Sequence, residues 1–514
     1  MSRVPRSPWR FELGPALALL AATACATYDA SYPRSQSRAF EGWRSAELAV
    51  FFAPPAGVGP DESGVDLIRY GRLALEARLA LAEVAEHTLD LQYYIWDADV
   101  SGRLLGEALY RAAERGVRVR LLLDDFSVVD RDSELARLSG HPEIEIRAFN
   151  PFRDRSRRVG DIFTDPWRVN RRLHNKVMIV DNAAALVGGR NIADHYFGVH
   201  GEANYRDLDA FVVGAAVRDA SRVFDDFWNS TWAVPYEAFV GAAATREDAR
   251  EQAAHMRERM AADPLPYPIR EDVAALREGL EELRERLVWA PVRVLYDDPA
   301  KAGDASVRGI AGELDALGSS ARSDILIENA YFVPRDRLVE VLSDAVARGV
   351  RVRVLTNSLA SNDVLAVHAG YRRSREALLR NGVEIHELRP DSAMKEHWSV
   401  LSTESRAGLH AKTLVVDGRW SVIGSYNLDP RSADIDTEVA LLVDSPAFAA
   451  RLAAFLDTGA DPVNSYRLYL EDGAVRWRGE GAGGDDVYEK EPETGWWRRF
   501  LVGVIGLLPI RSQL

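Results

Sequence analysis

Two short segments of this chain each place a histidine and a lysine two residues apart. The first reads LHNKVMIVD over residues 173–181, and the second reads LHAKTLVVD over residues 409–417. Each is followed by a glycine-containing element that ends in asparagine, GGRN at 188–191 and GSYN at 424–427. Because side chains alternate between the two faces of a β-strand, His174 and Lys176 should point the same way, as should His410 and Lys412.

An imidazole beside an ammonium group suits the chemistry of phosphodiesters. A neutral imidazole is a competent nucleophile, and a second, protonated imidazole can give its proton to the leaving alcohol. Unperturbed histidine titrates near ~6.5, so a neutral and a charged copy can coexist near neutral pH. Lysines and asparagines stabilise the charge that develops on the phosphate oxygens. Two such pairs facing one phosphate are what a double displacement requires.

The acidic residue that closes each segment has a different expected role. Asp181 and Asp417 lie an odd number of residues after their histidines. On a regular strand their side chains would therefore face away from the phosphate. We expect both to be turn and scaffold residues rather than catalytic ones.

The two segments belong to an internal repeat. RGVRVRLL at 115–122 recurs as RGVRVRVL at 348–355, and a β-like run (89–95 and 325–332) and a helix-like stretch (104–114 and 338–348) precede each copy. Gly116 and Gly349 supply the C-terminal stop of each helix. Strand, helix and strand joined by short connections predict a βαβ crossover. We therefore expect a duplicated α/β fold with parallel or mixed sheets and helices on their faces.

The paired motifs resemble those of the phospholipase D superfamily, in which His-x-Lys-x4-Asp is followed by Gly-Gly/Ser-x-Asn. Other stretches, VGGRNIADHYF at 187–197, RDLD at 206–209 and NLDPRS at 427–432, are similar to bacterial cardiolipin synthases of the lipoprotein-like C-type branch. The resemblance runs from about residue 66 to the C-terminus. It implies two homologous mixed-sheet α/β/α domains of phospholipase D type. A pseudo-two-fold axis would relate them and bring both histidine pairs into one cleft.

The resemblance also implies a role for each site residue. His174 would form a phosphohistidine, and His410 would protonate the leaving group and then activate the acceptor; near-symmetry leaves either histidine open as the nucleophile. The side chains expected to hold the phosphate are Lys176, Lys412, Asn191 and Asn427. The family also holds each histidine through an acidic residue on a following strand. Glu438 fits this role for His410, and Asp209 fits it for His174, with Asp207 as the competitor.

The loop after the second RGVRV copy is a candidate head-group site, because an α/β sheet usually builds its ligand crevice there. Asn362, Asp363 and His368 fall in this region. His368 could equally be a packed helix residue.

Both chain ends carry signals for a membrane. Three arginines within residues 1–10 precede an apolar run over 13–24 and then Cys25, which is the pattern of a secretory signal. LAATAC at 20–25 resembles a bacterial lipoprotein box, so we expect Cys25 to be lipidated. The alternatives are an ordinary secretory signal and a small buried cysteine. WWRR at 496–499 precedes an apolar run over 500–510 and favours an interfacial segment, with a helix docked on the core as the alternative.

These features divide the chain into five parts: a signal peptide over 1–25, a first phospholipase D-like domain over 45–235, a helical linker over 236–295, a second such domain over 296–460, and a C-terminal tail over 461–514. Within the tail, the stretch 479–493 is rich in glycine and acidic residues and is expected to be a loop.

The composition and net charge indicate which partners and cofactors to expect. The 514 residues carry a formal net charge of −14, whereas a protein that binds duplex nucleic acid usually presents a basic stripe. We therefore expect phospholipids and a membrane surface as partners rather than nucleic acid. No cluster of His, Cys and carboxylates has zinc-like spacing, so we expect no metal and no other cofactor. The single cysteine excludes an intramolecular disulfide.

The resemblance implies a phosphatidyltransferase that moves a phosphatidyl group onto phosphatidylglycerol, with phosphatidylethanolamine as a second candidate substrate. The enzyme would be a lipoprotein of the bacterial cell envelope that faces the periplasm. A hydrolytic phospholipase D, with water as the acceptor, is the alternative from the same chemistry. An exported nuclease and a non-catalytic lipid-binding lipoprotein are less favoured. The residues leave open the donor head group, a helper protein, the membrane and the oligomeric state.

Overall fold

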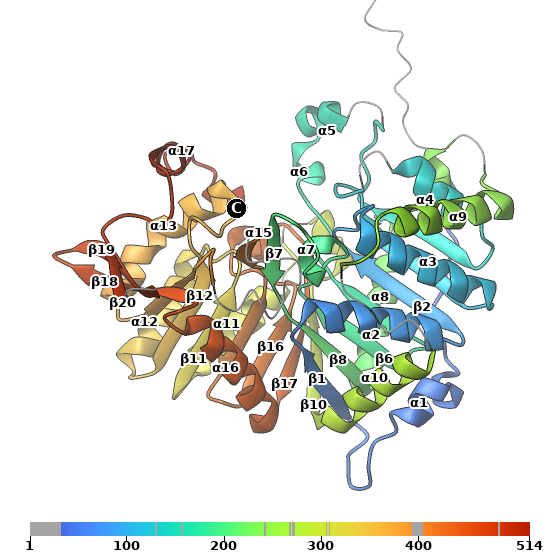
Figure 1. Ribbon diagram of the computed structural model, residues 1–514, viewed down its shortest axis with the longest axis horizontal. Helices are drawn as coiled ribbons and strands as arrows, with labels where there is room; N and C mark the ends of the chain where they lie inside the picture. The colour runs from blue at the N-terminus through green and yellow to red at the C-terminus, as the bar shows by residue number, and fades with distance from the viewer. Residues whose placement is uncertain are drawn as a thin grey trace, which may run out of the picture.

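The computed structural model describes residues 32–128, 131–155, 158–240, 243–266, 269, 273–304, 306–307, 309–392, 405–481 and 484–513. Cys25 and the expected signal peptide lie outside these residues. Figure 1 shows two α/β halves side by side, each with a sheet flanked by helices.

The first half is built on a mixed sheet. Its strands are β1 (Glu62–Ile68), β2 (Thr88–Tyr93), β3 (Arg118–Asp124), β4 (Ile144–Phe149), β5 (Val177–Val180), β6 (Ala184–Gly188), β8 (Asp209–Gly214) and β9 (Ala233–Pro235). Only β2, β3 and β4 run parallel to one another within this set, and the remaining pairings are antiparallel.

The second half repeats this pattern. Its strands are β10 (Val288–Tyr296), β11 (Asp324–Asn329), β12 (Arg351–Asn357), β13 (Glu384–Leu388), β15 (Lys412–Val416), β16 (Trp420–Gly424), β17 (Val439–Asp444) and β18 (Ser465–Glu471). Here β11, β12 and β13 form the parallel set.

A seam between β1 and β10 joins the two sheets. The two strands pair antiparallel, with Gly64 opposite Trp289. Outward from the seam the order is β1-β8-β6-β5-β2-β3-β4-β9 in one half and β10-β17-β16-β15-β11-β12-β13-β18 in the other. The same order on both sides of an antiparallel pair is what a pseudo-two-fold axis produces. The predicted fold class is therefore confirmed.

Each half contains the predicted βαβ crossover. Helix α3 (Val100–Glu114) joins β2 to β3, and α12 (Asp336–Ala347) joins β11 to β12. Gly116 and Gly349 follow these helices with φ values of 93° and 88°. This left-handed conformation is natural for glycine just after a helix, which explains why both copies of the repeat carry it.

The two halves also share a core behind the seam. Helices α8 (Ala215–Trp228) and α16 (Pro446–Ala460) are equivalent and bury Phe224, Phe227, Phe448 and Leu452 in one hydrophobic cluster. That cluster includes residues of β1, β10 and β17. Fully burying one such side chain contributes about 1.5–3 kcal/mol, so the halves stabilise one another.

The segment between the halves is only partly helical. Helices α9 (Arg246–Ala262) and α10 (Val273–Arg286) pack against α3 and against α2 (Gly71–Val84), respectively, on the outside of the first half. The last part of the expected linker, however, is strand β10. It buries Ala290, Val292 and Leu295, and its pairing with β17 makes it part of the second half's sheet.

The tail differs from expectation. Strands β19 (Ala474–Gly481) and β20 (Gly484–Tyr488) occupy much of the stretch expected to be a loop. Asp472 and Gly473, both with positive φ, make the tight turn between β18 and β19. Helix α17 (Trp496–Ile505) then packs on α13 (Leu365–Arg380) through Val502.

The remaining helices are short or peripheral: α1 (Glu47–Phe51), α4 (Asp132–Leu138), α5 (Arg158–Thr164), α6 (Pro166–Val169), α7 (Asp194–Phe197), α11 (Ile310–Ser320) and α15 (Pro430–Asp434). Strands β7 (Ala203–Arg206) and β14 (Arg406–Leu409) form a separate parallel pair between the halves. In the part of the chain that the structure describes, no helix combines the length and apolar character needed to cross a bilayer.

Candidate active site

Each histidine is fixed to the other half of the molecule through its backbone. His174 lies just before β5 and donates its backbone N–H to the Thr437 carbonyl at 2.9 Å. His410 lies just before β15 and donates to the Arg206 carbonyl at 2.8 Å. Both side chains are buried. The site is therefore built at the junction of the two halves, where their equivalent segments exchange hydrogen bonds.

The acidic partners are exchanged in the same way, which corrects the predicted pairing. Glu438 contacts His174 Nδ1 at 2.9 Å and 3.0 Å rather than His410. Asp207, the competitor, contacts His410 Nδ1 at 2.6 Å. Each carboxylate thus contacts Nδ1 of the histidine of the opposite half. The Nε2 atom of that histidine is then left for a phosphate.

Asp209 holds neither histidine. It is fully buried and pairs with Arg78 at 3.0 Å and Arg190 at 3.3 Å. The Leu208 carbonyl accepts from Gly189, as the Val439 carbonyl accepts from Ser425, so Asp207 and Glu438 are equivalent positions. Asp207 and Asp209 have the same parity along the chain, so a period-two argument could not separate them.

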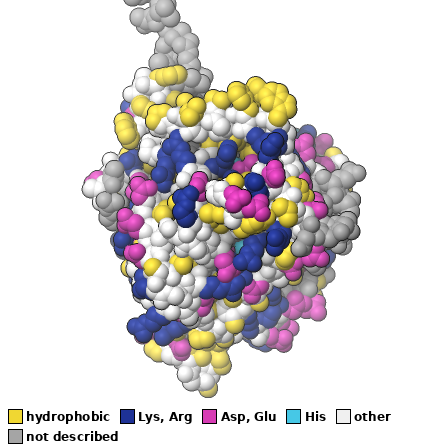
Figure 2. Space-filling view, turned by 90° about the vertical axis from the view of Figure 1, so that its left-hand side faces the viewer, with side chains coloured by type: hydrophobic (Ala, Val, Ile, Leu, Met, Phe, Trp, Pro, Cys, Tyr) yellow, Lys and Arg dark blue, Asp and Glu magenta, His cyan; other side chains and the backbone are white. Residues whose placement is uncertain are grey.

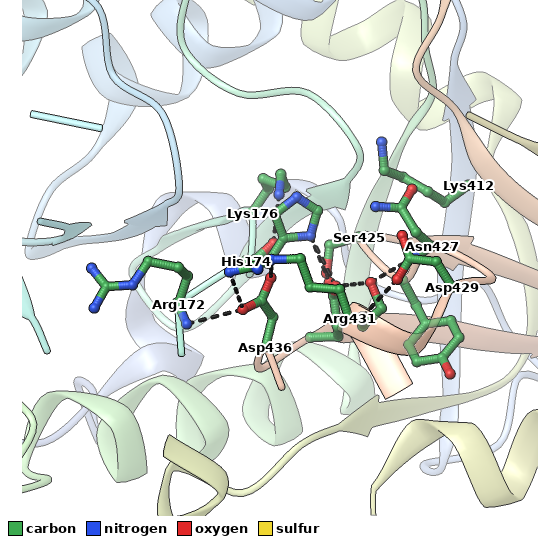
Figure 3. A network of polar contacts seen from close by, with 12 residues as sticks. Arg172, His174, Lys176, Lys412, Ser425, Asn427, Asp429, Arg431 and Asp436 are labelled. Carbon is green, nitrogen blue, oxygen red and sulfur yellow. Dashed lines mark hydrogen bonds and ion pairs between the residues drawn. The ribbon is translucent and has the colours of Figure 1, made fainter. Parts of the chain in front are cut away.

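The two lysines are buried beside their histidines. Lys176 Nζ donates to the His174 carbonyl at 2.6 Å, and Lys412 Nζ donates to the His410 carbonyl. Burial lowers the pKa of Lys176 well below its usual value and lowers the pKa of Lys412 to about 8. Figure 3 shows His174 and Lys176 beside Lys412 and Asn427 of the other half.

Burial and the nearby lysines favour the neutral form of both imidazoles. Burial, with the charges of Lys176 and Lys412, lowers the pKa of His174 well below its usual range. Burial and Lys412 lower the pKa of His410 to about 4. Because each imidazole is affected by the lysines of both halves, the two pairs share one electrostatic environment. A bound phosphodiester carries the opposite charge and would favour protonation of one imidazole.

The two carboxylates differ in their charge. Burial alone would raise the pKa of Asp207, but attraction to His410 and their hydrogen bond outweigh it and lower the value to about 2. Burial raises the pKa of Glu438 to about 7, although it accepts hydrogen bonds from Ser425 and Ser432. His410 therefore faces the more firmly ionised partner.

The difference between GGRN and GSYN follows from these carboxylates. A Cβ at Gly189 would lie 2.1 Å from Asp207 Oδ1, so only glycine fits there. At the equivalent position, Ser425 donates its hydroxyl to Glu438. The glycine–asparagine element thus shapes the carboxylate site as well as following the strand.

The two asparagines are not in equivalent states. Asn191 accepts from the backbone N–H of Ile95 at 3.1 Å and donates to the Tyr196 hydroxyl at 2.8 Å. The Asn427 side chain makes no hydrogen bond to the described residues, and its Oδ1 is buried. Its Nδ2 amide group is therefore the one that can donate to a ligand, whereas the Nδ2 of Asn191 donates to Tyr196.

Asp181 and Asp417 lie in turns after β5 and β15. Both have positive φ, at 52° and 53°. Asp181 accepts backbone N–H groups just before and at the start of β2, from Glu86 to Thr88, and Asp417 does the same before and at the start of β11, from Arg322 to Asp324. They anchor the central strands and do not reach the histidines.

Several aromatic residues around the histidines were not among the predicted site residues. The Tyr94 ring lies 5.1 Å from that of His174, and the rings of Tyr196, Tyr205 and Tyr331 lie 4.9–6.4 Å from that of His410. Spacing along the chain does not identify these tyrosines, because only the folded structure brings them together.

His368, one of the candidate head-group residues, is buried against Glu491 at 3.5 Å. It is therefore a packed helix residue.

The residues that the structure describes contain no group of His, Cys, Asp and Glu that could hold a metal ion. Lys176 and Lys412 are the cationic side chains that act on both imidazoles.

A duplicated α/β fold that brings one histidine–lysine pair from each half to a common site is the architecture of the phospholipase D superfamily. The family described as "Cardiolipin synthase, PLD-like domain" matches residues 79–228 and 315–458, one range in each half. The chain belongs to this family and is an enzyme of the phospholipase D superfamily.

Relatives agree with this assignment. The chain is 39% identical to "Cardiolipin synthase C" of Escherichia coli (strain K12), over 91% of this chain and 99% of that protein. It is 25% identical to "Cardiolipin synthase B" of the same strain, over 75% and 77%. The crystal structure of phosphatidylserine synthase from Haemophilus influenzae Rd KW20 matches 88% of this chain and 95% of its own, with a TM-score of 0.56 and 14% identity, and so shows the same fold.

Proposed function

We propose that the protein is a phosphatidyltransferase that makes cardiolipin through a phosphohistidine. Nε2 of His174 attacks the phosphorus of a donor phospholipid, and His410 gives a proton to the leaving head-group alcohol. The primary hydroxyl of a phosphatidylglycerol then gives its proton to His410 and attacks the phosphorus. The bond between phosphorus and Nε2 breaks, and its electron pair returns to the imidazole of His174.

The observation that carries this proposal is the exchange of carboxylates between the halves. It fixes two imidazoles by Nδ1 so that both Nε2 atoms remain for one phosphate. The division of roles has a physical basis. The ionised Asp207 stabilises an imidazolium at His410, which suits an acid and base, whereas His174 stays neutral and nucleophilic. Lys176, Lys412 and Asn427 would hold the phosphate oxygens.

Product analysis tests the proposal. The purified protein is incubated with phosphatidylglycerol, alone and with phosphatidylethanolamine, and the lipids are identified by mass spectrometry. Cardiolipin is the expected product, and phosphatidic acid alone would instead establish hydrolysis. His174→Asn and His410→Asn should each lower the rate by about 10²–10⁴-fold, while His255→Asn, an exposed histidine on α9, should match the wild type. Because lysines supply the charge, EDTA should leave the rate unchanged.

A covalent intermediate gives a second test. His410→Asn should accumulate label on the protein when it is supplied with a phosphate-labelled phosphatidyl ester of p-nitrophenol. This leaving group departs without a proton from His410, whereas the acceptor is no longer activated. The label should be stable to alkali and labile to acid, as expected of a phosphoramidate bond. Label that persists in a His174→Asn, His410→Asn double variant would argue against His174.

We also propose that the enzyme works at a membrane of the bacterial cell envelope, facing the periplasm, with Cys25 as a lipid anchor. The signal-like sequence before Cys25 and the exposed tryptophans of α17 support this. Growth with labelled palmitate should label the wild type and not Cys25→Ser. A wild-type protein that stays unlabelled and water-soluble would contradict the anchor.

A further inference from the structure

The surroundings of the two histidines are unequal, and the inequality points to a subsite. Three tyrosine rings contact His410: Tyr196 at 4.9 Å, Tyr205 at 5.5 Å and Tyr331 at 6.4 Å between ring centroids. Tyr205 belongs to β7 of the first half, and Tyr331 follows β11 of the second. Both halves therefore contribute to a wall around the histidine to which we assign proton transfer.

A carboxylate closes this wall on the solvent side. Asp363, between β12 and α13, accepts hydrogen bonds from Tyr331 at 2.9 Å and 3.0 Å and from Tyr205 at 3.2 Å. Asp363 is exposed, the two tyrosines are partly buried, and His410 is buried. The cluster thus leads from solvent to the imidazole.

Helix α17 supports the loop that carries Asp363. Arg498 donates to the Leu359 carbonyl at 3.1 Å and to the Asn362 carbonyl at 2.5 Å. The carboxylate is therefore held in place by its neighbour in the chain rather than left on a free loop.

We propose that Asp363, Tyr205 and Tyr331 form the head-group subsite, which binds a small alcohol with a second hydroxyl, such as glycerol. This inference rests on the proposed phosphatidyl transfer. A carboxylate has about four acceptor positions, and the two tyrosine hydroxyls, which carry one proton each, fill two of them. The second hydroxyl of the alcohol takes one of the remaining positions, and its reacting hydroxyl then points toward His410.

The charge of Lys412 favours a neutral hydroxyl over an ammonium group at this position. Lys412 Nζ lies 6.0 Å from the Tyr331 ring centroid, and this positive charge opposes the attraction of Asp363 for a second cation. Because Asp363 would attract an ammonium group on its own, ethanolamine is included in the test.

A competition between acceptors tests the subsite. With saturating phosphatidylglycerol as the donor, equal concentrations of 1,2-propanediol, 1-propanol and ethanolamine compete for the phosphohistidine. The ratio of products gives the ratio of kcat/KM values for the acceptors. The wild type should favour the diol over 1-propanol, and Asp363→Asn should reduce that ratio by about tenfold, the effect of one hydrogen bond to a charged group. Tyr331→Phe should reduce it less.

Glu376→Gln, an exposed acid on α13, is the matched control and should keep the wild-type ratio. An unchanged ratio in Asp363→Asn would overturn the subsite, and a wild-type preference for ethanolamine that is lost in Asp363→Asn would show an ammonium subsite instead. If the wild type forms only phosphatidic acid, the transfer function fails separately. Asp363→Asn should then still raise the KM for phosphatidylglycerol, because this lipid also carries a glycerol head group.

Discussion

At the scale of single residues, the two histidines depend on carboxylates with different charge. Glu438 is buried, has a pKa near neutrality and receives two serine hydroxyls, whereas Asp207 stays ionised in a direct contact with His410. Chemically similar side chains therefore do different work because their environments differ.

Replacing the exchanged carboxylates should separate catalysis from stability. Asp207→Asn and Glu438→Gln should each reduce kcat by about 10²–10⁴-fold, because an amide cannot stabilise an imidazolium or fix its tautomer in the same way. Asp209→Asn should instead destabilise the fold by about 3–5 kcal/mol, because it leaves buried arginines without their charge partner. Thermal unfolding and steady-state kinetics on the same samples distinguish the two results. An Asp209→Asn protein that is fully stable but inactive would instead support the predicted pairing of Asp209 with His174.

The pH profile should report Lys412. Its pKa is lowered to about 8 by burial, and a lysine is charged only below its pKa. The ammonium group that stabilises the phosphate is therefore lost as the pH rises through about 8, and kcat/KM should fall there. Lys412→Arg, which stays charged, should move this decline to higher pH even if its maximum rate is lower. An unchanged alkaline decline in Lys412→Arg would assign it to another group.

The sequence could predict the site residues but not their pairing. His174, Lys176, His410 and Lys412 follow from spacing, because side chains two residues apart in an extended segment point the same way. The partner of each histidine depends on how the two halves meet, and these contacts join residues 203 and 264 positions apart. The aromatic set around His410 was missed for the same reason.

At the scale of elements, the seam between β1 and β10 decides whether the halves meet correctly. Gly64 lies in this seam, and a Cβ there would lie 2.9 Å from Val213, 3.0 Å from Leu287 and 3.2 Å from Trp289. There is no room for a larger side chain unless the strands move apart.

Gly64→Val should therefore destabilise the protein by about 1–3 kcal/mol, the usual cost of overpacking. Urea unfolding followed by circular dichroism measures this change. Gly312→Ala is the control, because a Cβ at Gly312 in α11 meets nothing within 4 Å. A Gly64→Val protein as stable as the wild type would show that β1 and β10 can move apart at this position at little cost in stability.

The elements themselves were predictable where a local pattern specified them. The βαβ repeats were found because hydrophobic runs and helix-stopping glycines coincide. Strands β10, β19 and β20 were not, because a strand in a linker or tail is stabilised by distant partners. The Asp472-Gly473 pair was the one local signal for the hairpin between β18 and β19.

At the scale of the whole molecule, two exposed apolar segments lie along one edge. Phe163 and Trp167, in α5 and α6 of the first half, are 81% and 73% exposed, and Trp496 and Trp497 in α17 are 70% and 54% exposed. Figure 1 shows these helices along the upper edge, and Figure 2 shows hydrophobic side chains gathered along it. Asn170, just after α6, donates to Gln513 at 2.7 Å, so the chain beyond α17 returns to the first half.

This edge should bind lipid vesicles. Trp496→Ala/Trp497→Ala and Phe163→Ala/Trp167→Ala should each weaken binding to phosphatidylglycerol-containing vesicles by at least about tenfold, since each buried aromatic ring contributes about 1.5–3 kcal/mol. Sedimentation with vesicles measures the loss. Val50→Ala, an exposed apolar residue on α1, should bind as the wild type does. If only the Trp496→Ala/Trp497→Ala variant loses binding, the first half does not contribute to membrane binding.

The exchange of carboxylates explains what the duplication in one chain provides. A single half would hold a histidine without an acid, and two identical copies would have to associate to complete the site. One chain that contains both halves needs no such association. It also lets the two acids differ, with aspartate beside a glycine and glutamate beside a serine.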